Sequence, residues 1–384
     1  MTSTSKISPS DVLTYCKDLL PTDVHAKRVF SIAGAVTGVL HAASLAIHAI
    51  GLGLAVAEGK NSKHCIKQVD RLLSNPKFEV DHLFASWLAF VLSEREEVVV
   101  AMDWTDFDDD DHTTLALHLV TSHGRSTPLI WKTHQKSLLR DHRTQWEEDL
   151  VYGFIEKVPT SLKVTLLADR GFGSQEFYRF LRLHCIHFVI RFRGNVRVTD
   201  AHGVQHAAHD LVLSGGRPHM IRDAYVTEDQ TPVAAVVLVK AEKMKAPWCL
   251  ATSRADYTAS DVIKLYAKRF TIEETFRDQK DAHFGFGLVQ TSIGNCARRD
   301  RLLFIATLAQ ALLSLLGATA EHAKLDRLMK ANTSKKRTHS LLRQGLMWYA
   351  SIPNMPEERL RLLMQSIAEI IAQHAVMREI FGAL

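Results

Sequence analysis

Cysteine is scarce in this chain, and its five copies form no pattern. They are scattered and odd in number, and no two have C-x-x-C spacing. This distribution argues against a zinc site and a disulfide framework, and it favours a reducing compartment, the cytoplasm. The chain also opens without a charged segment followed by a compact apolar one, so we expect no secretory signal.

Formal charge is missing from the long stretch between Val29 and Ala57. The stretch exceeds the ~18 apolar residues at which a membrane span is normally considered. Histidine, serine, threonine and glycine residues within it dilute its hydrophobicity. We therefore expect no membrane span and no membrane partner.

The excess of positive charge is small, with a formal net charge of +5. Such a surplus is compatible with a polyanionic partner but does not identify one. At 384 residues, of which 46% are hydrophobic, the chain is long enough for a substantial core and more than one domain.

The most informative segment is YAKRFTIEETFRDQK, from Tyr266 to Lys280. In one helix of 3.6 residues per turn, Tyr266, Arg269, Glu273 and Lys280 would share an arc of roughly 60°. A carboxylate beside cations suits metal and phosphate chemistry, and a solvated face with ordinary ion pairs is the alternative. Glu274 would lie about 100° away from Glu273 and point elsewhere.

Two upstream apolar runs each end on an aspartate. Residues 98–102 precede Asp103 in VVVAMDWTDF, and residues 164–168 precede Asp169 in LLADRGFGS. Apolar runs of this length are typical of interior strands. Asp106 is a rival to Asp103, but it leads into an acidic stretch, 108–111, that we interpret as an exposed hairpin turn.

Two aspartates and one glutamate on a rigid scaffold could converge on one site. They would supply the hard oxygen ligands that a pair of Mg²⁺ ions needs. Two such ions ~3.5–4 Å apart activate an attacking oxygen and stabilise a leaving one at phosphorus. The sequence therefore indicates phosphodiester cleavage or transfer.

The spacing of Tyr266, Arg269, Glu273 and Lys280 resembles the Tyr-Arg-Glu-Lys signature of bacterial insertion-sequence transposases of the DDE type. The segment DWT at Asp103 resembles the first catalytic block of that family. ADRGFGS with FYRFLRLHCIHFVIRFRGN resembles the second block. TSKKRTHSLLRQGL and KHCIKQVDRLLSN are also similar to family sequence, so the resemblance covers most of the chain.

The resemblance implies an α/β catalytic core of ribonuclease-H-like, retroviral-integrase-like fold, with a mixed sheet flanked by helices. Asp103, Asp169 and Glu273 would be its catalytic, metal-binding triad for two Mg²⁺ ions, with Mn²⁺ as a substitute. Tyr266, Arg269 and Lys280 would contact phosphates of the transposon end.

The expected protein is a bacterial, cytoplasmic DNA transposase that acts on double-stranded DNA as a homodimer. It would cleave the element ends and transfer strands in cut-and-paste transposition, through a hairpin or by direct attack. Two other functions stay open. They are an inactive transposase-derived DNA-binding regulator, disfavoured because no block is missing, and a structure-specific nuclease, which leaves the N-terminal region unexplained.

Trp248, in PWCLATS, resembles the base-stacking tryptophan of family members that cut through a hairpin. Stacking of a base on an aromatic ring contributes roughly 1–3 kcal/mol, enough to hold an extruded nucleotide. The alternative is a core tryptophan in an insertion strand. We expect Trp104, next to Asp103, to pack.

Three regions are expected along the chain: a helical DNA-binding region 1–92, a catalytic core 93–290 and a C-terminal helical region 291–384. A β insertion, 195–250, would interrupt the core. In the first region Asn61 or Ser62 would cap a helix. Basic residues recur every four positions along this helix and form one edge: Lys63, Lys67 and Arg71. This basic edge would contact the element end. The alternative is a solvated helix face in a structural domain.

Overall fold

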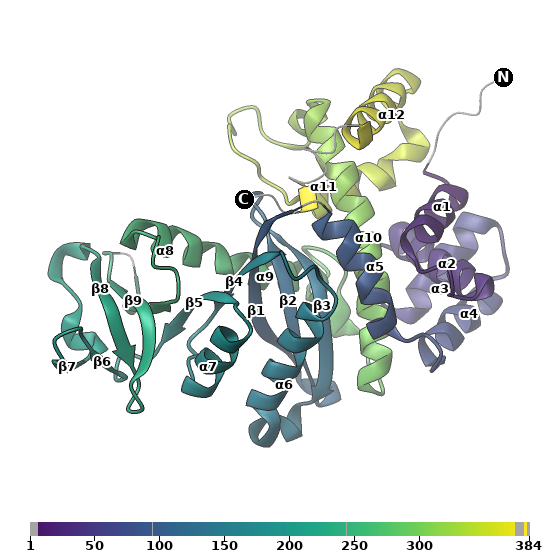
Figure 1. Ribbon diagram of the computed structural model, residues 1–384. Coiled ribbons are helices and arrows are strands. Elements are labelled where there is room, and N and C mark those ends of the chain that lie inside the picture. Colours follow the sequence, from purple (N-terminus) through teal and green to yellow (C-terminus); the bar gives the residue numbers. More distant parts are fainter. Residues whose placement is uncertain (1–6, 94, 243, 373–379, 382–384) are drawn as a thin grey trace.

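The computed structural model describes residues 7–93, 95–242, 244–372 and 380–381 (Figure 1). Parts of the predicted regions 1–92 and 291–384 therefore lie outside the described residues. Helices from the first 92 residues lie at one end of the molecule, a mixed sheet with helices occupies the middle, and further strands lie at the other end (Figure 1).

Five helices precede the sheet: α1 (Pro9–Leu19), α2 (Ala26–Ala42), α3 (Ile47–Glu58), α4 (Ser62–Ser74) and α5 (Val80–Leu92). The uncharged stretch forms α2 and α3, which are bent by 95° relative to each other. Glycine allows these two helices to pack closely, because a methyl group on Gly38 would lie 2.3 Å from the Ile50 carbonyl oxygen. Asn61 caps α4 by accepting a hydrogen bond from the His64 amide at 3.2 Å, as predicted.

The first five strands are β1 (Glu97–Phe107), β2 (His112–Val120), β3 (Ser126–Gln135), β4 (Lys163–Ala168) and β5 (His187–Phe192). β1, β2 and β3 pair antiparallel, whereas β4 is parallel to both β1 and β5. The helices α6 (Leu139–Ile155) and α7 (Gln175–Leu183) connect strands of this part.

The segment 195–250 forms strands that extend the same sheet. They are β6 (Arg197–Thr199), β7 (Gln205–Ala207), β8 (His219–Val226), β9 (Thr231–Val239) and β10 (Trp248–Thr252). The order across the ten strands is β3-β2-β1-β4-β5-β10-β9-β8-β6-β7. Because β10 pairs with β5, the strands of the expected insertion continue the sheet. That they form a domain of their own stays a prediction.

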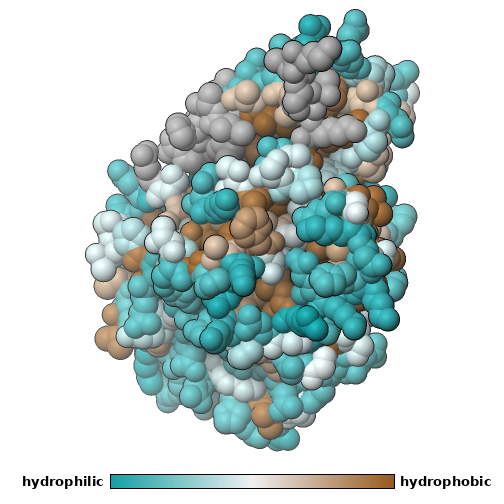
Figure 2. All heavy atoms as spheres, turned by 90° about the vertical axis from the view of Figure 1, so that its right-hand side faces the viewer, coloured by the Kyte–Doolittle hydropathy of each residue, from teal (hydrophilic) through white to brown (hydrophobic). Residues whose placement is uncertain are grey.

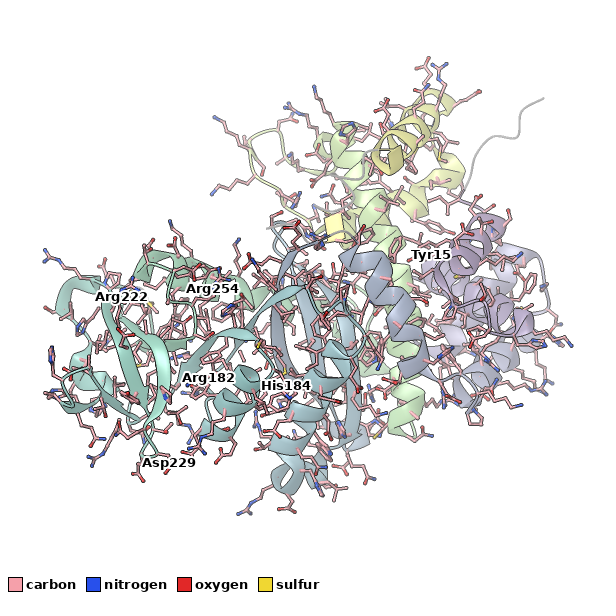
Figure 3. All side chains as sticks on the ribbon, in the orientation of Figure 1. Tyr15, Arg182, His184, Arg222, Asp229 and Arg254 are labelled. Carbon is pink, nitrogen blue, oxygen red and sulfur yellow. The ribbon has the colours of Figure 1, made fainter. Side chains whose placement is uncertain are left out.

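Three arginines labelled in Figure 3 join this extension to its surroundings. Arg182 on α7 donates to the Pro232 carbonyl at 3.0 Å, and Arg222 on β8 donates to the Ala255 carbonyl at 2.8 Å. Arg254, just after β10, donates to Glu97 Oε1 at 2.5 Å. The extension is thus fixed to Glu97, the first residue of β1, as well as to β5.

The remaining helices are α8 (Ala259–Ala267), α9 (Thr271–Lys280), α10 (Cys296–His322), α11 (Leu341–Ser351) and α12 (Glu357–Ala372). Short 3₁₀ turns lie at Asp108–Asp110, Lys136–Leu138, Ala208–Leu211, Ser214–Gly216, Lys268–Phe270, Leu288–Gln290, Leu325–Met329 and Ile352–Asn354. α10 contacts α2, β3, α11 and α12. By length and composition it could cross a membrane, but 78% of its most apolar window is buried inside the protein, as in a core helix.

Candidate active site

Asp103 and Asp169 lie side by side inside the sheet, where the parallel pairing of β1 with β4 ends. The parallel pairing of β1 with β4 ends at Met102 and Ala168, so the two aspartates follow the last pair. The sequence predicted that the strand would end at Asp103. Instead β1 continues to Phe107, because residues 103–107 keep their pairing with β2.

Each aspartate is held by hydrogen bonds. Asp103 Oδ1 accepts from the Trp104 amide at 2.9 Å, and Asp103 Oδ2 accepts from the Arg269 guanidinium at 3.1 Å. Asp169 Oδ1 accepts from the Gly171 amide at 2.7 Å. Burial raises the pKa of Asp103 to about 6, Arg269 opposes the rise, and the negative charges of Asp169 and Glu273 add to it. The three carboxylates therefore share one electrostatic environment.

The segment from Tyr266 to Lys280 is not one regular α-helix, so this prediction was wrong. α8 ends at Ala267, a 3₁₀ turn covers Lys268–Phe270, and α9 begins at Thr271. A 3₁₀ turn has 3.0 residues per turn, so side chains three apart eclipse. The Arg269 guanidinium accordingly lies over the Tyr266 ring, 5.8 Å from its centroid.

Arg269 joins two of the three carboxylates. Its side chain is 5% exposed, and it donates to Glu273 Oε1 at 2.5 Å as well as to Asp103. Glu273 has a half-exposed side chain. The Arg269 Nε atom is buried and has no hydrogen-bond partner within the described chain. Arg269 thus balances the negative charge of the site.

Lys280 lies apart from this cluster. Its Nζ atom donates to the Asp106 carbonyl oxygen at 2.6 Å and to Thr105 Oγ1 at 3.2 Å. It also lies over the Phe107 ring, 4.8 Å from the centroid. Burial lowers the pKa of Lys280 from its ordinary value. The predicted stripe therefore places a cation further along β1, beyond Asp103.

The two rival carboxylates have other partners. Asp106 accepts from Lys136 Nζ and from Thr113 Oγ1, both at 2.8 Å. Glu274 pairs with Arg277 and, at 3.3 Å, with Arg125. Neither rival hydrogen-bonds to Arg269 in the described part of the chain.

The acidic turn at 108–111 exists, but the expectation that all of it is exposed was wrong. The Asp110 side chain is 10% exposed and pairs with Arg299 on α10, whose side chain is fully buried. Asp110 also accepts from Ser292 Oγ and from the Ile293 amide, each at 3.0 Å. Its partners are about 180 residues away in the chain, so the local sequence could not reveal them.

Trp248 begins β10 and packs in an aromatic group near Arg269. Its ring contacts Tyr266 edge-on at 4.9 Å and stacks with Phe270 at 6.1 Å. Phe270 is 39% exposed, and the Arg269 guanidinium lies 4.6 Å from its centroid. The sequence interpretation missed Phe270, although it directly follows Arg269.

The sequence analysis also missed Arg143 and Glu147, an ion pair on α6. Glu147 is 3% exposed, and its Oε1 atom accepts from Trp104 Nε1 at 2.9 Å and from Arg143 Nε at 2.8 Å. Burial raises the pKa of Glu147, and the charge of Asp169 contributes. Trp104 packs against the core, as expected. Nothing in the sequence distinguishes Glu147 from its neighbour Glu148.

A basic groove lies between α2 and α4, on the end of the molecule where hydrophilic residues cover most of the face (Figure 2). Its volume is about 500 Å³, and its cationic lining comes from Lys27, Arg28, Lys67 and Arg71. No lining residue that the structure describes is acidic. Lys63 is exposed on α4 but does not line the groove, and Lys27 and Arg28 were missed from the sequence.

The carboxylates fit a divalent metal by chemistry. Their oxygens are the hard ligands that Mg²⁺ prefers. The pKa of Asp103 is raised mainly by burial and further by the negative charges of Asp169 and Glu273, and a bound cation would favour the ionised carboxylates. Among the described residues no three His, Cys, Asp or Glu side chains lie close enough together to hold a metal ion. Arg269 lies between Asp103 and Glu273 and neutralises them instead.

Comparison with known families identifies the class. The family model for the transposase DDE domain matches residues 94–308, so the chain belongs to this family. A search of curated proteins finds no match. The matched range contains all three carboxylates together with the ten strands. Family membership implies DNA as a substrate, and members of the family typically use a divalent metal.

Proposed function

We propose that this protein is the DNA transposase of an insertion sequence. It binds the element ends and catalyses metal-dependent strand cleavage and strand transfer, with a ribonuclease-H-like core over 93–290. One observation carries the proposal: Asp103 and Asp169 directly follow the last paired residues of the neighbouring parallel strands β1 and β4, and Arg269 connects Asp103 to Glu273. Residues 94–308 match the transposase DDE domain.

The carboxylates of Asp103, Asp169 and Glu273 would hold Mg²⁺ or Mn²⁺. With such ions bound there, the site would gain an activated attacking oxygen and stabilisation of the leaving oxygen at phosphorus. Hydrogen bonds from the Trp104 and Gly171 amides fix the orientation of the two aspartates before substrate arrives. Glu273 is the most exposed of the three, so it can adjust when DNA and metal enter.

The side chains around the carboxylates would bind the DNA end. Arg269 would neutralise charge at the scissile phosphate, with its guanidinium packed on the Tyr266 ring. Lys280 would contact a phosphate further along the DNA strand. Trp248 with the exposed ring of Phe270 offers a stacking surface for an extruded base. This surface supports the hairpin route over direct attack.

The helices of residues 1–92 would form the DNA-binding region. Lys67 and Arg71 share a groove with Lys27 and Arg28, which gives a concave basic surface suited to a phosphate backbone. Lys63 extends the basic edge on the exposed side of α4. Residues 291–384 would form a helical region that supports the core, and 195–250 would be the inserted segment. We propose a homodimer in the paired-end complex and a place in the cytoplasm.

The test is cleavage of DNA carrying the ends of the element that encodes this chain, with Mg²⁺ and with EDTA. Glu273→Ala is compared with Glu274→Ala, which removes the adjacent carboxylate but faces Arg277 and Arg125. We expect metal-dependent nicking and joining in the wild type and in Glu274→Ala, and none in Glu273→Ala.

Three results would contradict the proposal. Retained cleavage in Glu273→Ala would refute the triad. Tight binding to the ends without cleavage by the wild type would indicate the regulatory protein. Cleavage without joined products would indicate the structure-specific nuclease.

A further inference from the structure

One helix contacts the neighbours of both aspartates, although the aspartates lie on different strands. Glu147 on α6 receives two hydrogen bonds at the same oxygen, one from Trp104 Nε1 and one from Arg143 Nε. Trp104 is the residue whose backbone amide holds Asp103 Oδ1. α6 is therefore linked to the first aspartate through a single residue.

Arg143, the partner of Glu147, also contacts the turn that holds the second aspartate, Asp169. A methyl group on Gly171 would lie 2.8 Å from an Nη atom of Arg143 and 3.0 Å from Asp169 Oδ1. The Gly171 amide is the donor that holds Asp169. The Arg143 guanidinium also lies 5.5 Å from the Phe172 ring. The turn after β4 thus packs directly on Arg143.

These contacts form one continuous connection between the carboxylates. It runs from Asp103 through Trp104 to Glu147, and from Arg143 through Gly171 to Asp169. We propose, resting on the function proposed above, that Glu147 and Arg143 are positioning residues that set the spacing of Asp103 and Asp169 for metal binding. They act through Trp104 and Gly171 and do not touch the substrate.

The energetics favour positioning over a purely stabilising role. The Glu147 carboxylate is buried, but the Arg143 side chain is 39% exposed, so water screens this ion pair and it adds little net stability. Two donors on one buried carboxylate oxygen do fix its place, and Glu147 is 3% exposed. Groups that orient metal ligands typically change metal affinity or activity by 10–100-fold when they are altered.

The experiment is a titration of the full-length protein with Mn²⁺, followed by electron paramagnetic resonance, with thermal unfolding in EDTA as a separate readout. Glu147→Gln keeps the shape but removes the charge paired with Arg143, and Trp104→Phe keeps a ring but removes its N–H donor. Asp149→Asn is the matched control, an exposed carboxylate on the same helix. Asp103→Asn removes a proposed ligand.

We expect Glu147→Gln and Trp104→Phe each to weaken Mn²⁺ binding by about 10-fold. Their effects should be less than additive when combined, because both break one connection. Asp149→Asn should bind like the wild type, and unfolding midpoints in EDTA should stay close to the wild-type value. If Glu147→Gln fails to fold, Trp104→Phe decides the question alone.

The outcomes separate this inference from the function on which it rests. If Asp103→Asn loses Mn²⁺ while Glu147→Gln and Trp104→Phe bind it as tightly as the wild type, the positioning role is refuted and the metal site stands. If Asp103→Asn binds Mn²⁺ like the wild type, the proposed metal site fails and the positioning role fails with it.

Discussion

Replacing Arg299 by alanine should destabilise the protein strongly. The Arg299 side chain is fully buried, pairs with Asp110, donates from Nε to His112 Nδ1 at 3.0 Å and lies 3.8 Å from the Phe107 ring centroid. Removing one partner of a buried ion pair typically costs 3–5 kcal/mol, because the other charge is left uncompensated. Since two hydrogen bonds to Asp110 would remain, we expect a loss of about 3–5 kcal/mol with the cation–π contact included.

That loss is large beside the roughly 5–15 kcal/mol by which folded proteins are normally stable. Urea unfolding followed by circular dichroism in EDTA measures it. The double variant Arg299→Met with Asp110→Asn removes both charges and should recover at least half of the lost stability. A loss below about 1 kcal/mol in Arg299→Ala, or a double variant as unstable as the single one, would refute the reasoning.

Three further predictions concern pH, packing and DNA binding. Burial lowers the pKa of His118 to about 3, below the unfolded value of about 6.5, so the unfolded chain takes up the proton first and stability falls as the pH drops. Between pH 7 and pH 5 we expect the wild type to lose about 2 kcal/mol through this group, and a His118→Gln variant that lost as much would contradict the assignment. Gly38→Ala should cost about 1–3 kcal/mol in urea unfolding, because the new methyl group would clash with a backbone oxygen of α3; an unchanged midpoint would disprove the close packing. Replacing both Lys67 and Arg71 by alanine should reduce the slope of log K for duplex binding against log salt concentration by about 2, measured in EDTA. Lys77→Ala, outside the groove, should leave this slope unchanged. Equal slopes in the wild type and both variants would exclude the groove as a DNA-binding surface.

Local sequence predicted individual elements well and their termini less well. The apolar runs before Asp103 and Asp169 did form buried strands, since continuous hydrophobic residues favour a sheet covered on both faces. The sequence between Ala267 and Thr271 contains no glycine or proline, so nothing local announced the 3₁₀ turn there. The pairing of β10 with β5 depends on register between distant segments, which the sequence pattern does not encode.

Some residues of the candidate site could be predicted from local sequence, and others could not. Asp103, Asp169 and Glu273 could be named because each follows a recognisable local pattern, and their catalytic roles stay a prediction. Glu147 could not be named, because its significance comes from a hydrogen bond to a residue 43 positions earlier. Contacts of this kind arise only when the chain has folded.

The central position of α10 has a consequence for synthesis on the ribosome. The surfaces of α2, α5 and β3 that pack on this helix are complete by residue 135, and α10 begins at residue 296. At a translation rate of roughly 5–20 residues per second, those apolar surfaces stay without their partner for on the order of 10–30 s until α10 is translated. A nascent chain that stops short of α10 would leave them uncovered, so truncated products should be cleared by proteases or captured by chaperones.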